Sequence, residues 1–444
     1  MINRTKKNSI LLTILLVLPA LIGVYSACST PTALDSLAHS ATQPTNDDSG
    51  PPAPAPTPAP LLFWLEPRTS PVIGVGQVIN IYTALKGNVS TPYPAYVDPT
   101  TVTWSNSNPN FASIDVHGVV TGLASGTTTI SGAYQGNSSQ VVVQVSGKMV
   151  SHSIVVGAQP TRTYFLYTPD FGTTAGPFPL VVVMHGGGGT AMQVAASGMM
   201  NNLAQTHKFY VAYPEGTGVI QTFNAGSCCG TAKSRNIDDV LFIKNLLVDV
   251  EKSNIIDSAK IYASGFSNGA IMSHRLACEM ADKFAAIIPF SGGSGEFDFN
   301  LTNYFACTPS RPIPIIEFHA NNDRNYPIAG GAGNDGSSGT NFYPIQSTIN
   351  DWISRNNVTS MATTDTPTPT ETCYHYKTPA NSAMASAPVT LCVLNPVDVY
   401  DATNSIVFGG GHSWPGGVRS SSAKSDVPVI DFLANTYIWK LLGN

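Results

Sequence analysis

Short apolar runs alternate with longer amphipathic segments over residues 150–444. Continuous apolar runs are typical of strands buried on both faces of a parallel sheet, and the amphipathic segments between them are typical of covering helices. The pattern therefore predicts an α/β domain with a mainly parallel sheet. The expected strands are Thr163–Tyr167, Leu180–Met184, Tyr210–Tyr213, Ile261–Ser264, Ala286–Phe290, Ile315–Phe318 and Ile406–Phe408. The expected helices are Met199–His207, Asp238–Glu251, Ala270–Met280, Ile345–Asn356 and Val429–Leu442.

Residues 61–146 have a different pattern, in which short runs of alternating apolar and polar residues are separated by Gly, Asn and Pro. Short strands joined by tight turns are typical of an all-β sandwich. The clearest expected strands are Val78–Tyr82, Val102–Trp104, Thr128–Ile130 and Val141–Val145. Because no group of catalytic residue types gathers here, we expect a spacer or an attachment module with Trp104 in its core.

Residues 1–27 are typical of a lipoprotein-type export signal, because basic residues precede the short apolar run Ile10–Leu18. Small residues then precede Cys28, and bacterial lipoproteins carry lipid on a cysteine in this position. We therefore expect lipidation of Cys28, with plain secretion as the alternative. Residues 28–60 lack an apolar period and include Pro51–Pro60, which predicts a disordered, extended linker.

The composition agrees with export and excludes some partners. Only 11% of the residues are charged and the net charge is −5, whereas about 25% of residues are charged in an average soluble domain. No cluster of Lys and Arg follows the N-terminus, which argues against nucleic acid as a partner. No later apolar run approaches about 20 residues, so we expect membrane contact only through a lipid anchor.

Six cysteines remain when Cys28 is set aside, and an exported protein can hold them as disulfides. The candidate pairs are Cys278–Cys307, Cys373–Cys392 and the adjacent Cys228 and Cys229. A metal site is the alternative for the adjacent pair, and it is disfavoured because neither Cys-x-x-Cys nor a companion His pair occurs. The sequence leaves the pairing open, and we expect no metal.

The motif Gly265-Phe266-Ser267-Asn268-Gly269 lies between an expected strand and an expected helix. Gly-x-Ser-x-Gly in this context forms a nucleophile elbow, a strained turn that exposes the serine hydroxyl above a sheet. A Cβ at either flanking glycine would clash with the strand or the helix. The helix N-terminus also favours negative charge beside the serine, so Ser267 is the expected nucleophile.

A serine hydroxyl needs a base within hydrogen-bond reach and a carboxylate that orients the base. Asp323 follows the expected strand Ile315–Phe318, and His412 lies in a glycine-rich loop after the last expected strand. Both follow Ser267 in the order that an α/β-hydrolase sheet requires, so we expect Asp323 to orient His412 as the base. The lower-ranked acids are Asp335, Asp298, Asp398 and Asp401. Packing, loop anchoring or helix capping accounts for His319, His185, His207, His274, Asp238 and Asp239.

An oxyanion hole needs two backbone N–H groups aimed at the developing charge. One is expected from Asn268, the residue after the nucleophile. The other is expected from the run His185–Gly189, with Gly187 as the first choice and Gly188 as the second. Glycines there let the backbone approach a substrate without an intervening side chain.

Several motifs together resemble those of a known family. They are Leu180–Gly187, Asn224–Gly230, Asn236–Val240, Ile261–Gly269, Arg275–Cys278 and Gly410–Gly417. Residues from Thr163 to the C-terminus resemble extracellular polyhydroxybutyrate depolymerase-like and feruloyl-esterase-like carboxylesterases of the α/β-hydrolase fold. The resemblance implies Ser267, Asp323 and His412 as a catalytic triad. Residues 102–127 resemble bacterial Ig-like repeats of group 2.

The chain departs from the family in two places, and a tryptophan stands beside one of its motifs. The family usually has His-Gly-Thr-x-Asp where this chain has His319-Ala320-Asn321-Asn322-Asp323, so the acid is kept but its approach differs. Phe223 replaces the usual Trp, which implies an altered substrate pocket. Trp414 follows His412 closely and is expected either to line the acyl or alcohol pocket or to pack in the core.

The sequence thus predicts an α/β-hydrolase domain over residues 150–444, preceded by an Ig-like sandwich over residues 61–146. We expect an exported serine carboxylesterase that needs no cofactor and acts on an extracellular ester or polyester, in the manner of a polyhydroxybutyrate depolymerase. A feruloyl or acetylxylan esterase acting on plant polysaccharide is the alternative, and an adhesion protein with a non-catalytic hydrolase scaffold is the alternative of another class. We expect the Ig-like domain to contact a cell surface or polysaccharide, and we expect no C-terminal polymer-binding module.

Overall fold

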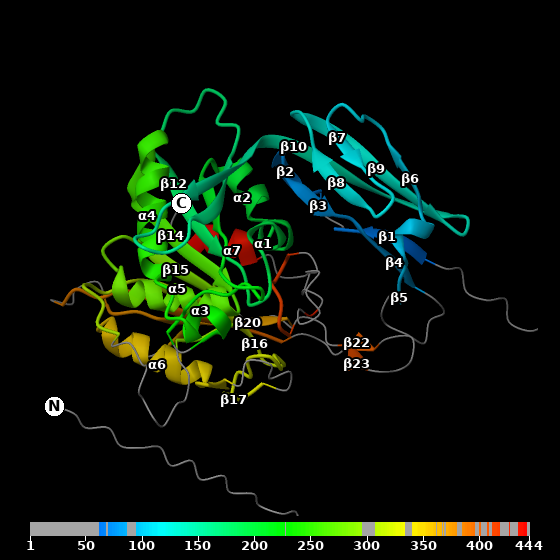
Figure 1. Ribbon diagram of the computed structural model, residues 1–444. Helices are drawn as coiled ribbons and strands as arrows, with labels where there is room; N and C mark the ends of the chain where they lie inside the picture. Colours follow the sequence, from blue (N-terminus) through cyan, green and yellow to red (C-terminus); the bar gives the residue numbers. More distant parts are fainter. Residues whose placement is uncertain are drawn as a thin grey trace, which may run out of the picture. The chain divides into compact units, whose positions relative to one another are not determined.

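The structure is a computed structural model that describes most of the chain after residue 61 (Figure 1). The described residues are 62–67, 70–86, 95–226, 228–294, 307–333, 340–360, 362–365, 367, 370–379, 384–395, 399–400, 406–407, 411–417, 426 and 434–441. The expected signal peptide, Cys28, the linker and the lower-ranked acids Asp298, Asp335, Asp398 and Asp401 lie outside these residues. Within them, no helix is both long and apolar enough to cross a membrane.

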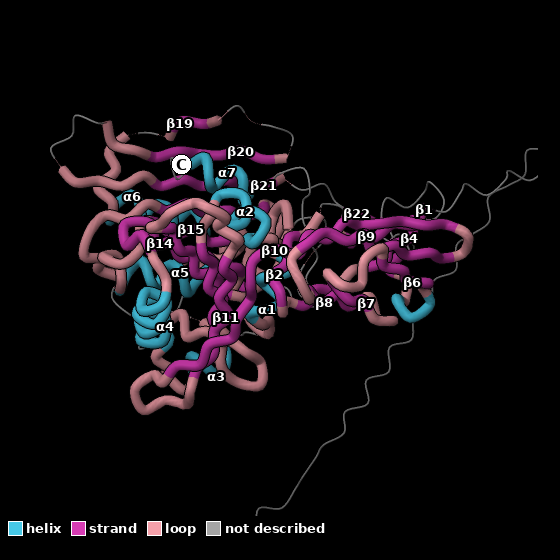
Figure 2. The backbone as a smooth tube through the Cα atoms, turned by 90° about the horizontal axis from the view of Figure 1, so that it is seen from above, coloured by secondary structure: helices cyan, strands magenta, loops and turns pink. Residues whose placement is uncertain are grey.

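The hydrolase domain is organised around a mainly parallel sheet, as the apolar runs predict. Its strands, in spatial order, are β20 (Glu371–Tyr376), β21 (Val389–Leu394), β16 (Ile315–Ala320), β15 (Ala286–Phe290), β14 (Ile256–Phe266), β12 (Phe178–Met184), β13 (Tyr210–Pro214) and β11 (Arg162–Thr168). The pairings from β13 to β21 are parallel, and β11 and β20 pair antiparallel at the two sides. A short strand, β19 (Thr363–Thr364), pairs with β20. Figure 2 shows β19, β20 and β21 side by side at one edge.

Helices cover both faces of this sheet. They are α1 (Ala191–Ser197), α2 (Met200–His207), α3 (Gly230–Ser234), α4 (Asp239–Ser253), α5 (Asn268–Glu279), α6 (Ile345–Arg355) and α7 (Ala434–Leu441). Strand β12 shows how the faces are filled, because Leu180, Val182 and Met184 join a core with α4, α5 and α6, whereas Val181 and Val183 join a core with α1, α2 and α7. Alternate side chains of a strand point to opposite faces, so an unbroken apolar run is what a doubly covered strand requires.

The last part of the sheet differs from the expectation. The expected strand at Ile406–Phe408 is wrong as a member of the main sheet, because among the described residues β23 (Ile406–Val407) pairs with β22 (Val399–Tyr400) and with no strand of that sheet. The sheet is completed instead by β21, whose run Val389–Leu394 the sequence reading missed. Five of the six β21 residues are fully buried, so the longer apolar run takes the covered position.

Asp238 and Asp239 behave differently, although both were expected to cap α4. The Asp238 carboxylate accepts the N–H of Leu241 at 2.9 Å, as a helix cap does. Asp239 is not a cap. It is fully buried and forms an ion pair with Arg162, with 2.7 Å between Oδ1 and Nη2.

The Ig-like domain is built from short strands around its own core. They are β1 (Leu62–Glu66), β2 (Val72–Val75), β3 (Val78–Asn80), β4 (Tyr82–Lys86), β5 (Ala95–Tyr96), β6 (Thr103–Asn106), β7 (Ala112–Ile114), β8 (Val119–Gly122), β9 (Gly126–Tyr134) and β10 (Asn137–Ile154), with a 3₁₀ turn at Pro99–Thr101. The single strand expected at Val78–Tyr82 is two strands, because β3 pairs with β8 and β4 pairs with β1. Trp104 is partly buried against this core, and its Nε1 donates to the Pro99 carbonyl at 3.0 Å.

Strand β10 belongs to both domains. Its residues 137–145 pair with β9 of the Ig-like domain, and its residues 148–154 pair with β11 of the hydrolase domain. The boundary expected near residues 146–150 therefore lies inside one continuous strand. The two domains are joined by hydrogen-bonded backbone rather than by a linker.

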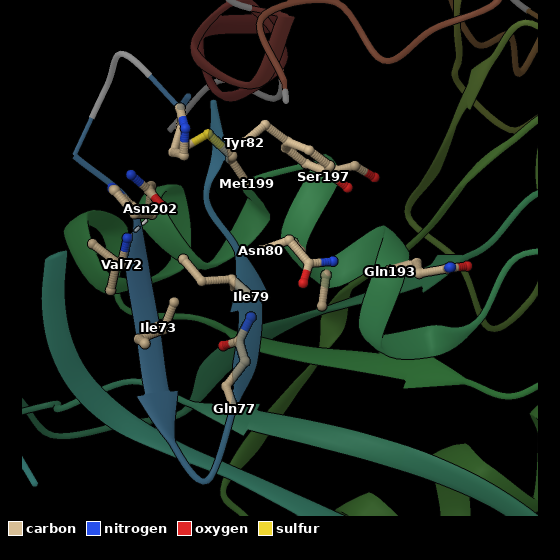
Figure 3. Close-up of a pocket in the computed structure, with 14 residues that line it drawn as sticks. Val72, Ile73, Gln77, Ile79, Asn80, Tyr82, Gln193, Ser197, Met199 and Asn202 are labelled. Carbon is tan, nitrogen blue, oxygen red and sulfur yellow. Dashed lines mark hydrogen bonds between the residues drawn. The ribbon is translucent and has the colours of Figure 1, made fainter. Parts of the chain in front are cut away.

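Buried amide side chains add to this junction. Asn201 of α2 donates from Nδ2 to Gln77 Oε1 at 2.7 Å, and its Oδ1 accepts the Tyr213 hydroxyl at 2.7 Å. Asn202 Oδ1 accepts the Val72 N–H at 2.9 Å. A pocket lies beside these residues, between β2 and β3 on one side and α1 and α2 on the other (Figure 3). None of the residues that line it is an expected site residue.

We predict that Asn201→Ala destabilises the chain by about 2–4 kcal/mol, because Gln77 and Tyr213 would each lose a buried partner. Urea unfolding of the wild type and the variant measures the free energy of unfolding. The matched control is Asn110→Ala at an exposed position, which should change that energy by less than about 0.5 kcal/mol. Equal effects of the two substitutions would show that the Asn201 bonds do not stabilise the junction.

Candidate active site

Ser267 occupies the sharp turn that its motif predicts. It lies between the end of β14 and the start of α5, with φ 54° and ψ −118°, a backbone conformation that non-glycine residues rarely adopt. A Cβ at Gly265 would overlap the carbonyl group of Gly269, and a Cβ at Gly269 would overlap the carbonyl group of Met184. Both glycines are therefore required by direct contact between β14, α5 and the end of β12.

Asp323 and His412 meet at the same edge of the sheet. Asp323 follows the end of β16, and its Oδ2 accepts a hydrogen bond from His412 Nδ1 at 2.8 Å. Its Oδ1 accepts the N–H groups of Asn325 at 2.9 Å and Tyr326 at 2.8 Å. Burial alone raises the pKa of Asp323, but the facing imidazole of His412, the ring of His319 and the Tyr326 amide together hold that pKa below its usual value. The carboxylate therefore stays ionised and fixes the proton of His412 on Nδ1, which leaves Nε2 as an acceptor.

Phe266, which precedes Ser267 in the chain, contacts the ring of His412. The Phe266 ring lies 4.7 Å from the His412 imidazole, centroid to centroid. Within the described part of the chain, no hydrogen bond joins the Ser267 hydroxyl to the imidazole. Such bonds are often long in the absence of substrate and tighten when it binds. The three residues expected from the sequence thus gather at the carboxyl ends of parallel strands, where open α/β sheets bind ligands.

Asp426 binds the backbone of His412, and the sequence did not predict this contact. Its Oδ2 accepts the His412 N–H at 2.6 Å, and its own N–H donates to the His412 carbonyl at 2.9 Å. Burial raises the pKa of Asp426, and its hydrogen bond with the His412 N–H opposes that shift. No motif surrounds Asp426 in the sequence, so only its contact with the His412 loop reveals its role.

The glycine run after β12 passes directly beside Ser267. A Cβ at Gly186 would lie 3.2 Å from Ser267 Cβ, and a Cβ at Gly187 would lie 3.9 Å from Asn268 Cβ. The Gly188 N–H donates to the Gln221 carbonyl at 2.8 Å, so this amide is already engaged. Of the two glycines expected to supply an oxyanion donor, Gly187 is therefore the one that faces Asn268 with space around it.

His185 anchors this glycine run as a neutral ring. Its Nδ1 donates to the Gly186 carbonyl at 2.7 Å, and its Nε2 accepts the Gly216 N–H at 2.9 Å. Burial lowers the pKa of His185 to about 4. A second proton on His185 Nε2 would point at the Gly216 N–H. Protonation of His185 would therefore break the hydrogen bond that Nε2 accepts from Gly216.

Phe223 and Trp414, both considered as pocket residues, lie in the core. Phe223 is fully buried, its ring lies 4.8 Å from that of His185, and the Asn268 side chain binds both its N–H at 2.7 Å and its carbonyl at 2.9 Å. Trp414 stacks on Phe290 at 4.0 Å, and its Nε1 donates to Asn435 at 3.1 Å. Close aromatic packing and these hydrogen bonds hold both rings in the core, which is one of the two positions expected for Trp414, and an altered substrate pocket at Phe223 stays a prediction.

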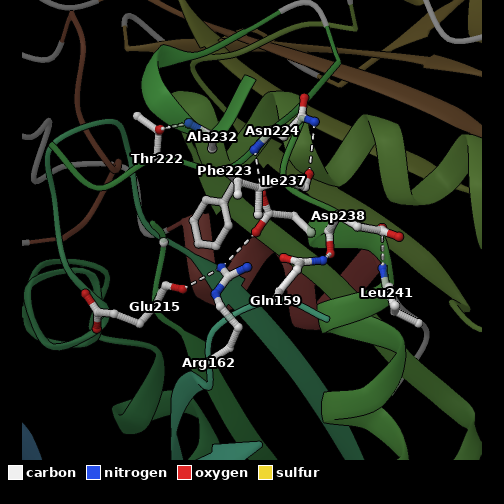
Figure 4. A network of polar contacts seen from close by, with 12 residues as sticks. Gln159, Arg162, Glu215, Thr222, Phe223, Asn224, Ala232, Ile237, Asp238 and Leu241 are labelled. Carbon is white, nitrogen blue, oxygen red and sulfur yellow. Dashed lines mark hydrogen bonds and ion pairs between the residues drawn. The ribbon is translucent and has the colours of Figure 1, made fainter. Parts of the chain in front are cut away.

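A buried ion pair supports the loop that carries Phe223 (Figure 4). Asp239 Oδ2 accepts the Asn224 N–H at 2.7 Å, and Arg162 pairs with the same carboxylate. Arg162 also donates to the Glu215 carbonyl at 2.9 Å and lies 4.0 Å above the Phe242 ring. Burial raises the pKa of Asp239, and the charge of Arg162 opposes that shift. One cation thus connects β11, α4 and the two loops beside the elbow.

All three candidate disulfides are present. Cys228 is bonded to Cys229 next to Phe223 and Asn224, Cys278 of α5 is bonded to Cys307, and Cys373 is bonded to its register partner Cys392 across β20 and β21. No group of three or more potential metal ligands occurs among the described residues.

Comparison with known proteins assigns the family. A family model described as esterase PHB depolymerase matches residues 162–327, which include Ser267 and Asp323. A probable feruloyl esterase C of Aspergillus niger is 30% identical over 43% of this chain and 68% of its own length. The chain belongs to this esterase family. The model of the group 2 bacterial Ig-like domain matches residues 82–145, so the N-terminal sandwich is an Ig-like domain.

Two further relatives are similar over smaller shares of their own length. Feruloyl esterase B of Piromyces equi is 28% identical over 53% of this chain and 39% of its own length. Poly(3-hydroxyalkanoate) depolymerase C of Paucimonas lemoignei is 33% identical over 29% of this chain and 31% of its own length. The chain therefore spans less than half the length of either relative.

We predict that His185 makes the esterase less stable in acid. Its pKa of about 4 lies below the ordinary value of 6.5, so the unfolded chain binds more protons. This contribution is fully present above about pH 6.5 and falls, by at most about 3 kcal/mol, as the pH drops to about 4.

The free energy of unfolding at pH 7.5 and pH 5, measured with urea, tests this. His185→Gln should be less stable at pH 7.5 but should lose less stability between the two pH values. His117→Gln, at an exposed histidine, serves as the control and should keep the wild-type difference. An unchanged difference in His185→Gln would contradict the assignment.

Proposed function

We propose that the protein is a secreted serine carboxylesterase that uses Ser267, His412 and Asp323 as a catalytic triad. The observation that carries this proposal is the buried hydrogen bond of 2.8 Å between Asp323 Oδ2 and His412 Nδ1, beside a serine held at φ 54° in a nucleophile elbow. A neutral imidazole with its proton fixed on Nδ1 can accept the serine proton at Nε2.

In the proposed reaction, Ser267 Oγ attacks the ester carbonyl carbon while its proton passes to His412 Nε2. The negative oxygen that forms is stabilised by the N–H groups of Asn268 and Gly187. His412 then returns the proton to the departing alcohol, and the carbonyl re-forms as an acyl-enzyme. Water, deprotonated by His412, releases the acid and restores the Ser267 hydroxyl. The departing alcohol carries away the proton that left Ser267, and the proton taken from water restores the Ser267 hydroxyl, so the protons balance without a cofactor.

The substrate we propose is an extracellular polyester of the polyhydroxyalkanoate type. The family match and the similarity to a poly(3-hydroxyalkanoate) depolymerase support it. Feruloyl or acetyl esters of plant polysaccharide are the second candidate, supported by the feruloyl esterases among the relatives. We further propose lipid anchoring at Cys28 and attachment to a surface or polysaccharide through the Ig-like domain. An adhesion protein with an inactive scaffold remains the alternative of another class.

We predict that Ser267→Ala lowers kcat for p-nitrophenyl butyrate by at least about 10⁴-fold, because the nucleophile is lost. Ser258→Ala, at an exposed position of the same strand, is the control and should keep wild-type activity. A fluorophosphonate should label the wild type and Ser258→Ala but not Ser267→Ala. A wild type that neither takes the label nor hydrolyses p-nitrophenyl butyrate, methyl ferulate, acetylated xylan or polyhydroxybutyrate granules would favour the adhesion alternative.

A second prediction concerns Asp426. Asp426→Ala removes the acceptor of the His412 N–H, and the displaced imidazole should lower kcat by about 10–100-fold with little change in KM. Asp426→Asn keeps an oxygen acceptor in the same place and should retain most of the activity. The steady-state kinetics of both variants on p-nitrophenyl butyrate decide this, and equal losses in the two would argue against a positioning role for the contact.

A further inference from the structure

A row of buried titratable side chains continues behind Asp323, away from Ser267. It consists of His274 on α5 and Glu317 and His319 on β16, all fully buried. The proposed mechanism uses none of these groups. A buried charge is costly unless another charge or a hydrogen bond compensates it, so each member needs a physical account.

His274 is a neutral ring whose tautomer is fixed from both sides. The Trp352 indole N–H donates to His274 Nδ1 at 3.0 Å, so that nitrogen carries no proton. The other nitrogen, Nε2, therefore carries the proton and donates it to Glu317 Oε2 at 3.1 Å. His274 supplies Glu317 with a hydrogen bond but with no compensating charge.

His319 lies between the two buried carboxylates. Its Nε2 donates to the Tyr326 carbonyl at 2.8 Å, so Nε2 carries a proton, and the same atom is 3.7 Å from Asp323 Oδ2. Its Nδ1 is 3.6 Å from Glu317 Oε1. Among the described residues, neither His319 Nδ1 nor Glu317 Oε1 has another hydrogen-bond partner, so the two atoms are available to each other.

A cation in this position balances the charges. With His412 neutral and His274 neutral, two buried carboxylates would otherwise lie close together with no positive charge between them. A proton on His319 Nδ1 supplies that charge and gives Glu317 Oε1 a partner. Burial by itself lowers the pKa of His319, but the carboxylates of Glu317 and Asp323 and the Tyr326 carbonyl raise it above its usual value.

We propose that His319 is held as an imidazolium between Glu317 and Asp323 and acts as a positioning residue for the triad. It would restrain Asp323 Oδ2, the oxygen that His412 also contacts, and offset part of the negative charge of the carboxylate. Glu317 would hold this cation in place from the other side. The catalytic part of this inference rests on the proposed esterase function, whereas the charge of His319 does not.

The other groups that face the row do not replace this cation. Tyr326 contributes its backbone carbonyl to His319 and lies ring to ring with it at 5.3 Å. Beyond Asp323, the charged or titratable neighbours are His412 and Asp426, and Asp426 is also in electrostatic contact with Arg324. His319 is the imidazole that lies within 4 Å of both buried carboxylates.

The charge of His319 can be measured without any assay of activity. The full-length wild type is labelled with ¹⁵N-histidine, and His319, one of nine histidines, is assigned from its contact with the Tyr326 ring. We expect both ring nitrogens of His319 to be protonated at pH 7 and at pH 8. A single protonated nitrogen at pH 7 would overturn the proposal, whether or not the protein hydrolyses esters.

Two charge-removing variants test the effect on the triad. His319→Gln removes the cation but keeps a donor for Tyr326, and it should move the acidic limb of the kcat/KM profile for p-nitrophenyl butyrate upward by about half to one pH unit. Glu317→Gln removes an anion and should move the limb downward by a similar amount. Both variants are first checked for native circular dichroism.

Shifts of the acidic limb in opposite directions would show that charge is the cause. A merely structural defect would lower the activity of both variants without moving the two limbs in opposite directions. Shifts in the same direction, or no shift in either folded variant, would overturn the positioning role. If the wild type hydrolyses no ester, the proposed function fails, and the nitrogen measurement still decides the charge of His319.

Discussion

The close contact of three backbone segments at the elbow is the constraint on which this structure depends. The end of β14, the start of α5 and the end of β12 approach so closely that Gly265 and Gly269 leave no room for a Cβ. That approach gives Ser267 its positive φ and brings Gly186 beside its side chain. Ser267 and the glycine run are thus placed by the same backbone packing, before the side chains of Asp323 and His412 contribute.

Around this contact, a chain with few charges buries several of them with specific partners. Arg162 and Asp239 connect the loops on one side of Ser267, while Glu317, His319, Asp323 and His412 form a continuous row on the other. Breaking a buried pair leaves an uncompensated charge, so such groups restrict the loops to one arrangement. The hydrogen bonds of Asp426 to both backbone groups of His412 extend this restriction to the loop that carries His412.

The Ig-like domain shares this rigidity, because β10 pairs with β9 at one end and with β11 at the other. One strand therefore forms backbone hydrogen bonds in both domains. The buried contact of Asn201 with Gln77 and Tyr213 reinforces the junction.

Much of the fold and the nucleophile-elbow turn could be predicted from the order of residues along the chain. Unbroken apolar runs correspond to the doubly covered strands β12, β15 and β16, and the spacing of Gly265, Ser267 and Gly269 corresponds to the elbow, because steric and solvation rules act on neighbours along the chain. Contacts between residues far apart in the chain could not be predicted from such local patterns. The pairing of Asp239 with Arg162, the hold of Asp426 on His412 and the burial of Phe223 and Trp414 arose only when distant segments packed together. A lone carboxylate or ring has the same local sequence signature whether it faces solvent, a substrate or a buried partner, and the fold alone selects among these.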